Sequence, residues 1–410
     1  MVSVCFYFQV HQPFRVRKYR VFDIGSPNYF SYEGESNLNN KLVLEKVARK
    51  CYIPANKLLL KLLRKHEKFK VSFSLSGVVI EQFERFFPEV LDSFKELVKT
   101  GKVELLGETY YHSLAFLKSR REFVRQVKKH ERKLWQVFKI KPQVFRNTEL
   151  IYNNELARVA GELGYSGVLA EGHEKILGWR SPNFVYSPAG AKRIKLLLKN
   201  YKLSDDIAFR FSERSWSEWP LTASKFSAWV SALNGNADTV NLFMDYETFG
   251  EHQWQSTGIF EFLESLPKEL LKHPDNDFKT PSEVIASYPA RDTIDAPYFI
   301  SWADIERDLS AWLGNKMQLA ALNSLYSLEQ DVMQTRDEAL IDSWAKLQTS
   351  DHFYYMCTKW FSDGDVHKYF NPYESPYDAF INFMNVLNDL KARIDDKLKR
   401  RKLLNDNKHL

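Results

Sequence analysis

The chain has 410 residues, of which 44% are apolar, 27% charged and 15% aromatic, a composition that excludes a disordered or low-complexity protein for all but the ends. Its net charge of +6 is concentrated in residues 391–410, which hold eight Lys or Arg against three Asp. Because the rest of the chain is nearly neutral, we expect no nucleic-acid partner. The cysteines Cys5, Cys51 and Cys357 are too widely spaced to suggest a disulfide framework or a thiolate metal site.

No apolar run approaches the roughly 18 residues that a membrane-spanning helix requires. The first residues, MVSVCFYFQVHQP, lack the basic segment of a secretory signal and become polar at Gln9. We therefore expect a cytoplasmic protein with no membrane partner.

Short strand-like runs alternate with helical patterns over the first 300 residues. The predicted strands are residues 2–10, 71–75, 103–106, 144–150, 167–170, 193–198 and 239–244, and the predicted helices are residues 41–66, 81–100, 120–138, 153–163 and 224–233. This alternation predicts an α/β fold with a parallel sheet, and seven strands suggest an incomplete TIM-type (β/α)7 barrel. An open doubly wound sheet is the alternative, disfavoured because no Gly-rich phosphate loop follows a strand.

The pattern changes at about residue 301. Residues 301–333 have helical periodicity, with Ile305, Leu309, Trp312 and Leu313 on one face, and residues 337–347 and 376–398 form further predicted helices. We therefore predict two domains, a barrel over residues 1–300 and a C-terminal α-helical domain over residues 301–410.

Ionisable residues collect directly after four of the predicted strands, in the sequences HQP (11–13), GETYYH (107–112), RNTE (146–149) and DYETFGEH (245–252). Any one of them could simply cap a strand or helix. Four such clusters at strand ends instead predict a site at the C-terminal mouth of the barrel, where enzymes of this fold hold their active sites.

Two acids in these clusters, Glu149 and Asp245, lie 96 residues apart on different predicted strands and could face each other across the mouth. A pair of carboxylates flanking the substrate is what glycosidic cleavage requires, although the spacing alone is weakly specific. The rival carboxylates are Glu104, Glu108, Glu247 and Glu251. Strand alternation predicts that Asp245 and Glu247 both point inward, with Tyr246 pointing away.

The segments HQPFR, VFRNTEL, FMDYETFGEH and LQTSDHFYYMCTK, in this order, resemble the conserved regions of glycoside hydrolase family 57, most of all its α-amylase and amylase-like branch. GKVELLGETYYHSLAF is similar to that family's second region, and the resemblance extends from Ser3 to about Asp389. It implies an incomplete (β/α)7 barrel followed by a helical domain, and action on α-glucans with retention of configuration and without a metal or other cofactor. It also implies that Glu149 is the nucleophile and Asp245 the general acid/base.

The resemblance further implies a set of substrate-binding residues. They are His11, Gln12, His112, Glu247, His252, Asp351 and His352. Trp254 is added as an aromatic surface on which a sugar could stack. Because Asp351 and His352 lie beyond residue 301, the helical domain is expected to contribute to the substrate cleft.

The sequence therefore predicts an α-amylase-type retaining glycoside hydrolase whose partner is an α-1,4-glucan such as starch, glycogen or a maltooligosaccharide. A 4-α-glucanotransferase is an alternative, because it differs only in whether a sugar or water accepts the glycosyl group. A non-catalytic glucan-binding protein is disfavoured because neither acid is lost. A polysaccharide deacetylase is disfavoured because Phe116 replaces the second histidine of the metal pair that His112 begins. Chain-length preference and oligomeric state are left open.

Overall fold

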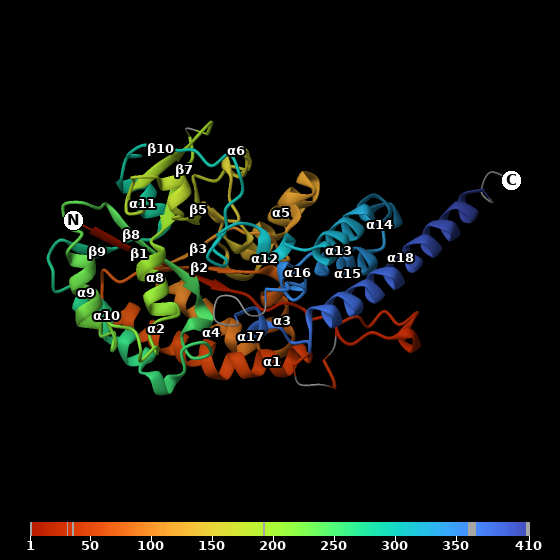
Figure 1. The fold of residues 1–410 in the computed structure, drawn as a ribbon, viewed down its shortest axis with the longest axis horizontal. Coiled ribbons are helices and arrows are strands. Elements are labelled where there is room, and N and C mark those ends of the chain that lie inside the picture. The colour runs from red at the N-terminus through yellow and green to blue at the C-terminus, as the bar shows by residue number, and fades with distance from the viewer. Residues whose placement is uncertain (1, 31, 35–36, 192, 360–365, 407–410) are drawn as a thin grey trace. The chain divides into compact units, whose positions relative to one another are not determined.

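The computed structural model describes residues 2–30, 32–34, 37–191, 193–359 and 366–406 of the chain (Figure 1). The chain forms two compact units. Unit 1 consists of Met1–His11, Leu44–Thr109 and Val127–Trp302, and unit 2 of Gln12–Val43, Tyr110–Gln126 and Ala303–Leu410. Two segments from the first third of the chain thus belong to the same unit as its last hundred residues.

Seven parallel strands build the barrel of unit 1, as the sequence predicts. They are β1 (Val2–Val10), β2 (Val71–Leu75), β3 (Val103–Leu105), β4 (Val144–Arg146), β5 (Gly167–Glu171), β7 (Lys195–Lys199) and β8 (Thr239–Asp245). β1 pairs with both β2 and β8, β2 pairs with β3, β4 with β5, and β5 with β7. A bridge between Gly107 and Phe145 joins β3 to β4. Between β7 and β8, the side chain of Asn241 donates to the carbonyl oxygen of Leu198 over 2.8 Å.

Among the described residues, three further strands lie outside this ring. β6 (Val185–Pro188) pairs antiparallel with β7, β9 (Asn276–Phe278) pairs with the start of β1, and β10 (Thr293–Ile294) pairs with β6. The chain thus has the predicted fold, an incomplete (β/α)7 barrel followed by a helical C-terminal region.

Helices follow the barrel strands of unit 1. They are α2 (Ile53–Lys65), α3 (Gly77–Phe86), α4 (Pro88–Lys99), α6 (Asn154–Glu162), α7 (Glu174–Leu177), α8 (Tyr201–Ala208), α9 (Ala223–Ser231), α10 (Ile259–Leu270) and α11 (Pro281–Ser287), while α1 (Asn40–Val47) and α5 (Arg120–Phe138) have residues in both units. The single helix predicted over residues 81–100 is two helices, because Pro88 has no N–H to continue the first and begins the second. The helix predicted over residues 41–66 is interrupted by a π-helical turn at Ala48–Tyr52.

Unit 2 is helical. Its last hundred residues form α12 (Ser310–Leu313), α13 (Lys316–Ser327), α14 (Glu329–Thr335), α15 (Glu338–Lys346), α16 (Ser350–Tyr354), α17 (Val366–Phe370) and α18 (Pro376–Asp406). The helix predicted to begin at residue 301 is wrong before residue 310. Asp304 and Arg307 have φ of 55° and 50°, values that no α-helix contains, and Ile305 is 80% exposed rather than part of an apolar face.

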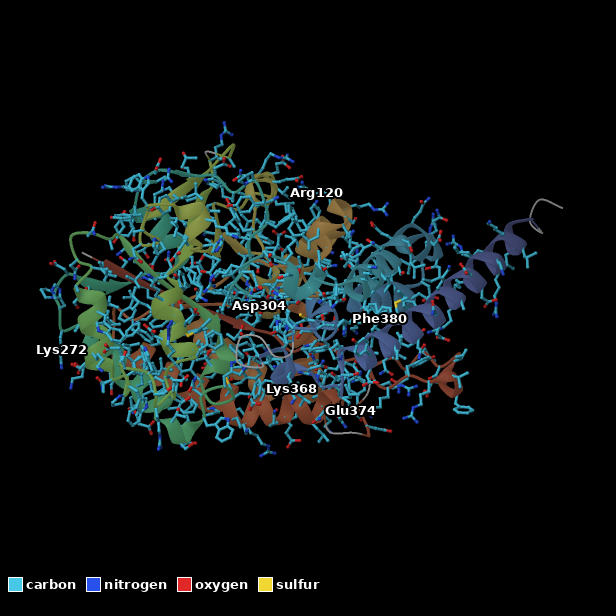
Figure 2. The ribbon with its side chains drawn as sticks, viewed as in Figure 1. Arg120, Lys272, Asp304, Lys368, Glu374 and Phe380 are labelled. Carbon is cyan, nitrogen blue, oxygen red and sulfur yellow. The ribbon has the colours of Figure 1, made fainter. Side chains whose placement is uncertain are left out.

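A charged cluster explains part of this departure. Asp304, labelled in Figure 2, accepts a hydrogen bond from Nε2 of His367 over 2.9 Å and forms an ion pair with Lys359 at 3.2 Å. Burial disfavours the charged imidazole, but the hydrogen bonds to Asp304 and Cys357 raise the pKa of His367 to about 9. The irregular segment therefore presents Asp304 to α17 instead of continuing a helix.

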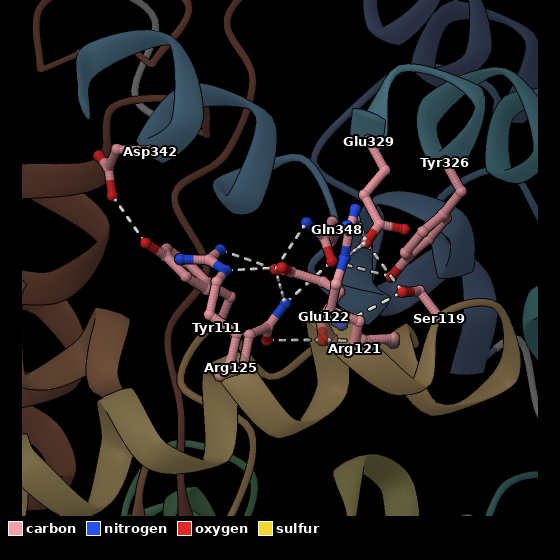
Figure 3. Close-up of polar contacts among 12 residues, drawn as sticks. Tyr111, Ser119, Arg121, Glu122, Arg125, Tyr326, Glu329, Asp342 and Gln348 are labelled. Atoms are coloured by element: carbon pink, nitrogen blue, oxygen red, sulfur yellow. Dashed lines mark hydrogen bonds and ion pairs between the residues drawn. The ribbon is translucent and has the colours of Figure 1, made fainter. Parts of the chain in front are cut away.

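A buried polar network holds the segment Tyr110–Gln126 within unit 2 (Figure 3). Glu122, which is fully buried, accepts two hydrogen bonds from Arg125, at 2.6 and 2.8 Å, and one from Gln126 at 2.8 Å. Gln348 also donates to Glu122 over 3.1 Å and accepts from Tyr326 over 2.9 Å. The start of α5 is thereby tied to α13 and to the segment before α16.

No helix among the described residues is both long and apolar enough to cross a membrane.

Candidate active site

A ring of polar side chains follows the apolar interior of the barrel. The buried residues of this interior include Tyr7, Leu106, Val144, Leu169, Leu197 and Phe243, which come from six barrel segments. Side chains two positions apart on a strand share a face, so the next inward positions on five strands are those of Gln9, Arg146, Glu171, Lys199 and Asp245. Glu108 lies beyond the end of β3 and joins this ring by accepting a hydrogen bond from Gln9 over 3.4 Å. In spatial order from β3 to β8 these positions alternate in charge, as Glu, Arg, Glu, Lys and Asp. The C-terminal mouth of the barrel is thus lined by alternating charges directly above its apolar core.

Glu149 lies in a tight 3-10 turn, Thr148–Leu150, and not on a strand as the sequence predicts, because β4 already ends at Arg146. Its φ of 57° and ψ of 24° put it in the left-handed region, and Leu150 follows with φ of 50°. Such backbone costs a non-glycine residue about 1–3 kcal/mol and is found most often at functional sites. The turn directs a half-buried carboxylate away from the regular strand.

The carboxylate of Glu149 accepts a hydrogen bond from the indole of Trp302. The distance between Nε1 of Trp302 and Oε2 of Glu149 is 2.8 Å, and the backbone N–H of Trp302 also donates to the carbonyl oxygen of Glu149 over 3.2 Å. The Trp302 side chain is partly buried. One carboxylate oxygen of Glu149 therefore has a fixed donor.

Asp245 is the last residue of β8 and is half-buried. In the β1–β8 ladder it pairs with Gln9, whose side chain accepts from the Tyr7 hydroxyl over 2.7 Å and donates to Glu108 over 3.4 Å. Burial raises the pKa of Tyr7 far above its ordinary value, so its hydroxyl stays protonated. Asp245 is at the carboxyl end of one strand and Glu149 follows the carboxyl end of another in the same parallel barrel, so both belong to the same mouth.

Two cations lie near the ring of Trp302. The guanidinium carbon of Arg146 is 4.9 Å and the ammonium of Lys199 5.6 Å from the ring centroid, both within the range of cation–π attraction. Lys199 also forms ion pairs with Asp205 at 3.0 Å and Glu171 at 3.6 Å. Arg146 is fully buried, and none of its three guanidinium nitrogens has a hydrogen-bond partner among the residues that the structure describes.

The rival carboxylates have other partners. Glu104 accepts from the backbone and hydroxyl of Ser282, both at 2.9 Å, and burial raises its pKa. Glu251 forms ion pairs with Lys46 at 2.6 Å and Lys50 at 3.5 Å.

Glu247 departs from the alternation that the sequence suggests. β8 ends at Asp245, and Tyr246–Thr248 is a 3-10 turn, so strand parity does not extend to Glu247. Its carboxylate instead accepts a hydrogen bond from the hydroxyl of Tyr52, in the π-helical turn. Tyr246 does point away from the barrel interior, since it packs on Phe73 and Phe94.

Three more predicted site residues belong to unit 1. Nδ1 of His11 lies 2.7 Å from the hydroxyl of Ser76, the N-cap of α3. The protein packed around His252 lowers its pKa to about 4, which leaves the imidazole neutral at pH 7. Trp254 is 59% exposed, with the ammonium of Lys50 5.6 Å from its ring centroid.

The other four predicted residues, Gln12, His112, Asp351 and His352, belong to unit 2. Two of their motifs meet there, because the backbone N–H of Ser350 donates to the carbonyl oxygen of His112 over 2.9 Å. Gln12 accepts from Arg15 over 3.1 Å, and the buried ring of His352 packs on Phe383.

Sequence reasoning missed four residues of the barrel mouth: Arg146, Glu171, Lys199 and Trp302. The first three could have been found, because each lies two positions after an apolar residue of its strand and is a charge at an inward position. No local signal marks Trp302, whose partner is 153 residues away.

No group of three or more His, Cys, Asp or Glu side chains among the described residues is arranged to hold a metal ion.

Comparison with known proteins agrees with this architecture. Residues 5–297 match the family model described as Glycosyl hydrolase family 57. A protein of Methanocaldococcus jannaschii named "Putative alpha-amylase" is 45% identical over 407 residues, covering 96% of this chain and 85% of that protein.

Two solved structures share the fold at low sequence identity. A GH57 branching enzyme from Thermococcus kodakaraensis superimposes with a TM-score of 0.67 at 14% identity, covering 97% of this chain and 94% of that one. A 4-alpha-glucanotransferase from Thermococcus litoralis gives a TM-score of 0.60 at 16% identity, covering 94% of this chain but 59% of that one. With the family model matched over most of its length, the chain belongs to glycosyl hydrolase family 57.

Proposed function

We propose that this protein is a retaining glycoside hydrolase of the α-amylase type, with α-1,4-glucans as substrates, Glu149 as nucleophile and Asp245 as general acid/base. The observation that carries the proposal is the pair itself. Glu149 sits on a strained turn after β4 and Asp245 at the end of β8, at one mouth of a family 57 barrel. The 45% identity to a protein named "Putative alpha-amylase" supports the choice of activity.

The proposed reaction has two steps. In the first, Asp245 protonates the glycosidic oxygen while a carboxylate oxygen of Glu149 attacks the anomeric carbon, which breaks the C–O bond and forms a β-linked glycosyl ester. In the second, Asp245 takes a proton from water, the water oxygen attacks the same carbon, and Glu149 leaves as a carboxylate. Two inversions restore the α configuration.

Several side chains of unit 1 are suited to binding the sugar. The neutral imidazole of His252 can donate one hydrogen bond to a hydroxyl group or accept one from it. The contact of 2.7 Å between Nδ1 of His11 and the Ser76 hydroxyl fixes the ring of His11 at the end of β1. The exposed indole of Trp254 offers an apolar surface to a glucose ring.

Matched amide variants test the two roles. Glu149→Gln and Asp245→Asn should fold normally and lose starch hydrolysis by several orders of magnitude. On an aryl α-maltoside, whose leaving group needs little protonation, Asp245→Asn should still form the glycosyl-enzyme and then stall, and azide should restart turnover and yield a glycosyl azide. Glu149→Gln forms no such intermediate and should show no rescue of this kind.

Glu251→Gln is the control, because Glu251 is an acid of the same motif that is already paired with lysines. If Asp245→Asn kept near-normal turnover on starch while Glu251→Gln or Glu247→Gln abolished it, the acid/base assignment would be wrong.

Transfer to a sugar acceptor proceeds through the same glycosyl-enzyme, so 4-α-glucanotransferase activity is the second candidate. The fold shared with a 4-alpha-glucanotransferase is compatible with it. Chromatography of products from maltooligosaccharides separates the two, since only transfer yields chains longer than the substrate. A wild-type enzyme that binds starch but produces neither pattern would indicate a non-catalytic glucan-binding protein.

A further inference from the structure

The segment that carries Trp302 is attached to the Glu149 turn at several points. Tyr152 and Ile300 exchange two backbone hydrogen bonds of 2.9 Å, and two residues further along, the backbone N–H of Trp302 donates to the carbonyl oxygen of Glu149. This pairing brings the indole within 2.8 Å of Oε2 of Glu149. These backbone hydrogen bonds hold the segment that carries the indole against the turn that carries the carboxylate. The contact between the two side chains is therefore fixed by the main chain.

An N–H donor held on one carboxylate oxygen has a defined effect on a nucleophile. It restricts rotation of the carboxylate, so that the other oxygen, Oε1, is presented in one orientation. Hydrogen bonds to a charged acceptor are about twice as strong as neutral ones.

The two cations near the ring strengthen this donor. Arg146 and Lys199, both buried, lie 4.9 and 5.6 Å from the Trp302 centroid. Positive charge beside an indole draws electron density toward itself and makes the N–H more acidic, as in polarised hydrogen-bond chains. The buried guanidinium of Arg146, which makes no hydrogen bond to any described residue, lowers the stability of the fold. A contribution to stability therefore does not explain why a charge is buried at this position.

On the basis of the proposed function, we propose that Trp302 is a positioning residue for the nucleophile, holding Oε2 of Glu149 through an indole N–H that Arg146 and Lys199 polarise. Trp302 acts through Glu149 and makes its contribution in the glycosylation step.

The test uses Trp302→Phe, which keeps an aromatic ring and removes the N–H. The value of kcat/KM on an aryl α-maltoside should fall about 10- to 100-fold, the range for one hydrogen bond to a charged group. The Kd for maltoheptaose, measured by calorimetry in Glu149→Gln and in Glu149→Gln/Trp302→Phe, should differ by less than about threefold, because binding does not use the contact. Trp179→Phe is the control, since Trp179 is 88% exposed.

Three results would overturn the proposal. One is an unchanged kcat/KM in Trp302→Phe. Another is a Kd that weakens by the same factor as kcat/KM, which would make Trp302 a sugar-stacking surface. The third is a loss of kcat/KM accompanied by an equal loss of folded protein, read from the melting curve. Failure of the proposed function itself has a separate signature, namely that Glu149→Gln retains turnover.

A second measurement isolates the nucleophile. In Glu149→Ala, azide can take the place of the missing carboxylate and attack the aryl α-maltoside, giving a β-glycosyl azide. If Trp302 acts only through Glu149, adding Trp302→Phe should leave azide-dependent turnover within about threefold, while the same change in the wild type costs 10- to 100-fold. Equal losses in both backgrounds would contradict the proposal.

Discussion

Two buried polar clusters in this protein have opposite hydrogen-bonding character. In unit 2, Glu122 receives hydrogen bonds from Arg125, Gln126 and Gln348, and the amide of Gln348 is itself bonded on both its oxygen and its nitrogen (Figure 3). In the barrel mouth of unit 1, Arg146 is as deeply buried but has no hydrogen-bond partner among the described residues. The first cluster completes its own hydrogen bonds, and the second does not.

This difference distinguishes structural polarity from functional polarity. A satisfied network fixes one arrangement of the chain, and removing a member leaves its partners buried and unpaired. A buried charge without hydrogen bonds lowers the stability of the fold. We therefore expect to find such a charge where the function of the protein requires it. Here the unsatisfied cation borders Trp302, which contacts the proposed nucleophile.

The largest effect on stability is expected in the satisfied network. Glu122→Ala leaves the buried donors of Arg125, Gln126 and Gln348 without their acceptor. The substitution should therefore lower the free energy of unfolding by about 3–5 kcal/mol. Specific activity per folded molecule should stay near the wild-type value, because the hydrogen bonds of Glu122 go to Arg125, Gln126 and Gln348 and to no proposed catalytic residue. Chemical denaturation with a parallel activity assay measures both, and a stable but inactive variant would contradict the comparison.

The same substitution at two arginines sharpens the contrast. Arg146→Met should lower kcat/KM about tenfold, by removing the charge beside Trp302, while the melting temperature stays equal or rises, because an apolar side chain of similar length is cheaper to bury. Arg125→Met should instead lower the melting temperature and spare kcat/KM, since Arg125 makes two hydrogen bonds to Glu122. Arg146→Met in the Trp302→Phe background should have little further effect.

The barrel could be predicted from sequence because each strand is a short apolar run that carries its own signal. The same runs locate most of the mouth, since Arg146, Glu171 and Lys199 follow core residues at a spacing of two. The contact between Trp302 and Glu149 could not be predicted, because it depends on how a segment after the last barrel strand returns to β4. The departure from helix at Asp304 depends on His367, a partner 63 residues later. The break at Pro88, by contrast, has a local signal in the sequence, because a proline cannot continue a helix.

A charge pair of unit 2 should make stability depend on pH. The pKa of His367 is about 9 in the folded protein, above the ordinary value near 6.5. Its contribution is therefore fully present below about pH 6.5 and is lost as the pH rises through 9. His367 contacts Asp304 and Cys357, and Lys359 forms an ion pair with the same Asp304.

Melting temperatures at pH 6, 7.5 and 9.5 check this dependence. His367→Gln should melt several degrees below the wild type at pH 6, and the gap should close by pH 9.5. A gap that grows with pH would show that His367 is neutral in the folded protein. Activity at pH 6 should be unaffected, as for Glu122→Ala.

The smallest effect is expected at the basic end of α18. Ile394 is fully buried, whereas Lys402, Leu403 and Leu404 are exposed. This basic end of the helix therefore contributes no side chain to the hydrophobic core. Deleting residues 399–410 should leave turnover within a few-fold of wild type and shift the melting temperature little, because solvated chain ends rarely support a site.

A deletion that starts six residues earlier, at residue 393, provides the matched comparison. It also removes Ile394 and the hydrogen bond of 3.0 Å from Arg393 to Tyr29, and should destabilise the protein by about 2 kcal/mol or more. Loss of turnover in the shorter deletion with an unchanged melting curve would mean that charge at this end of unit 2 serves function. The contrast between the satisfied polar network of unit 2 and the polar residues of the barrel mouth would then not extend to this end of the helix.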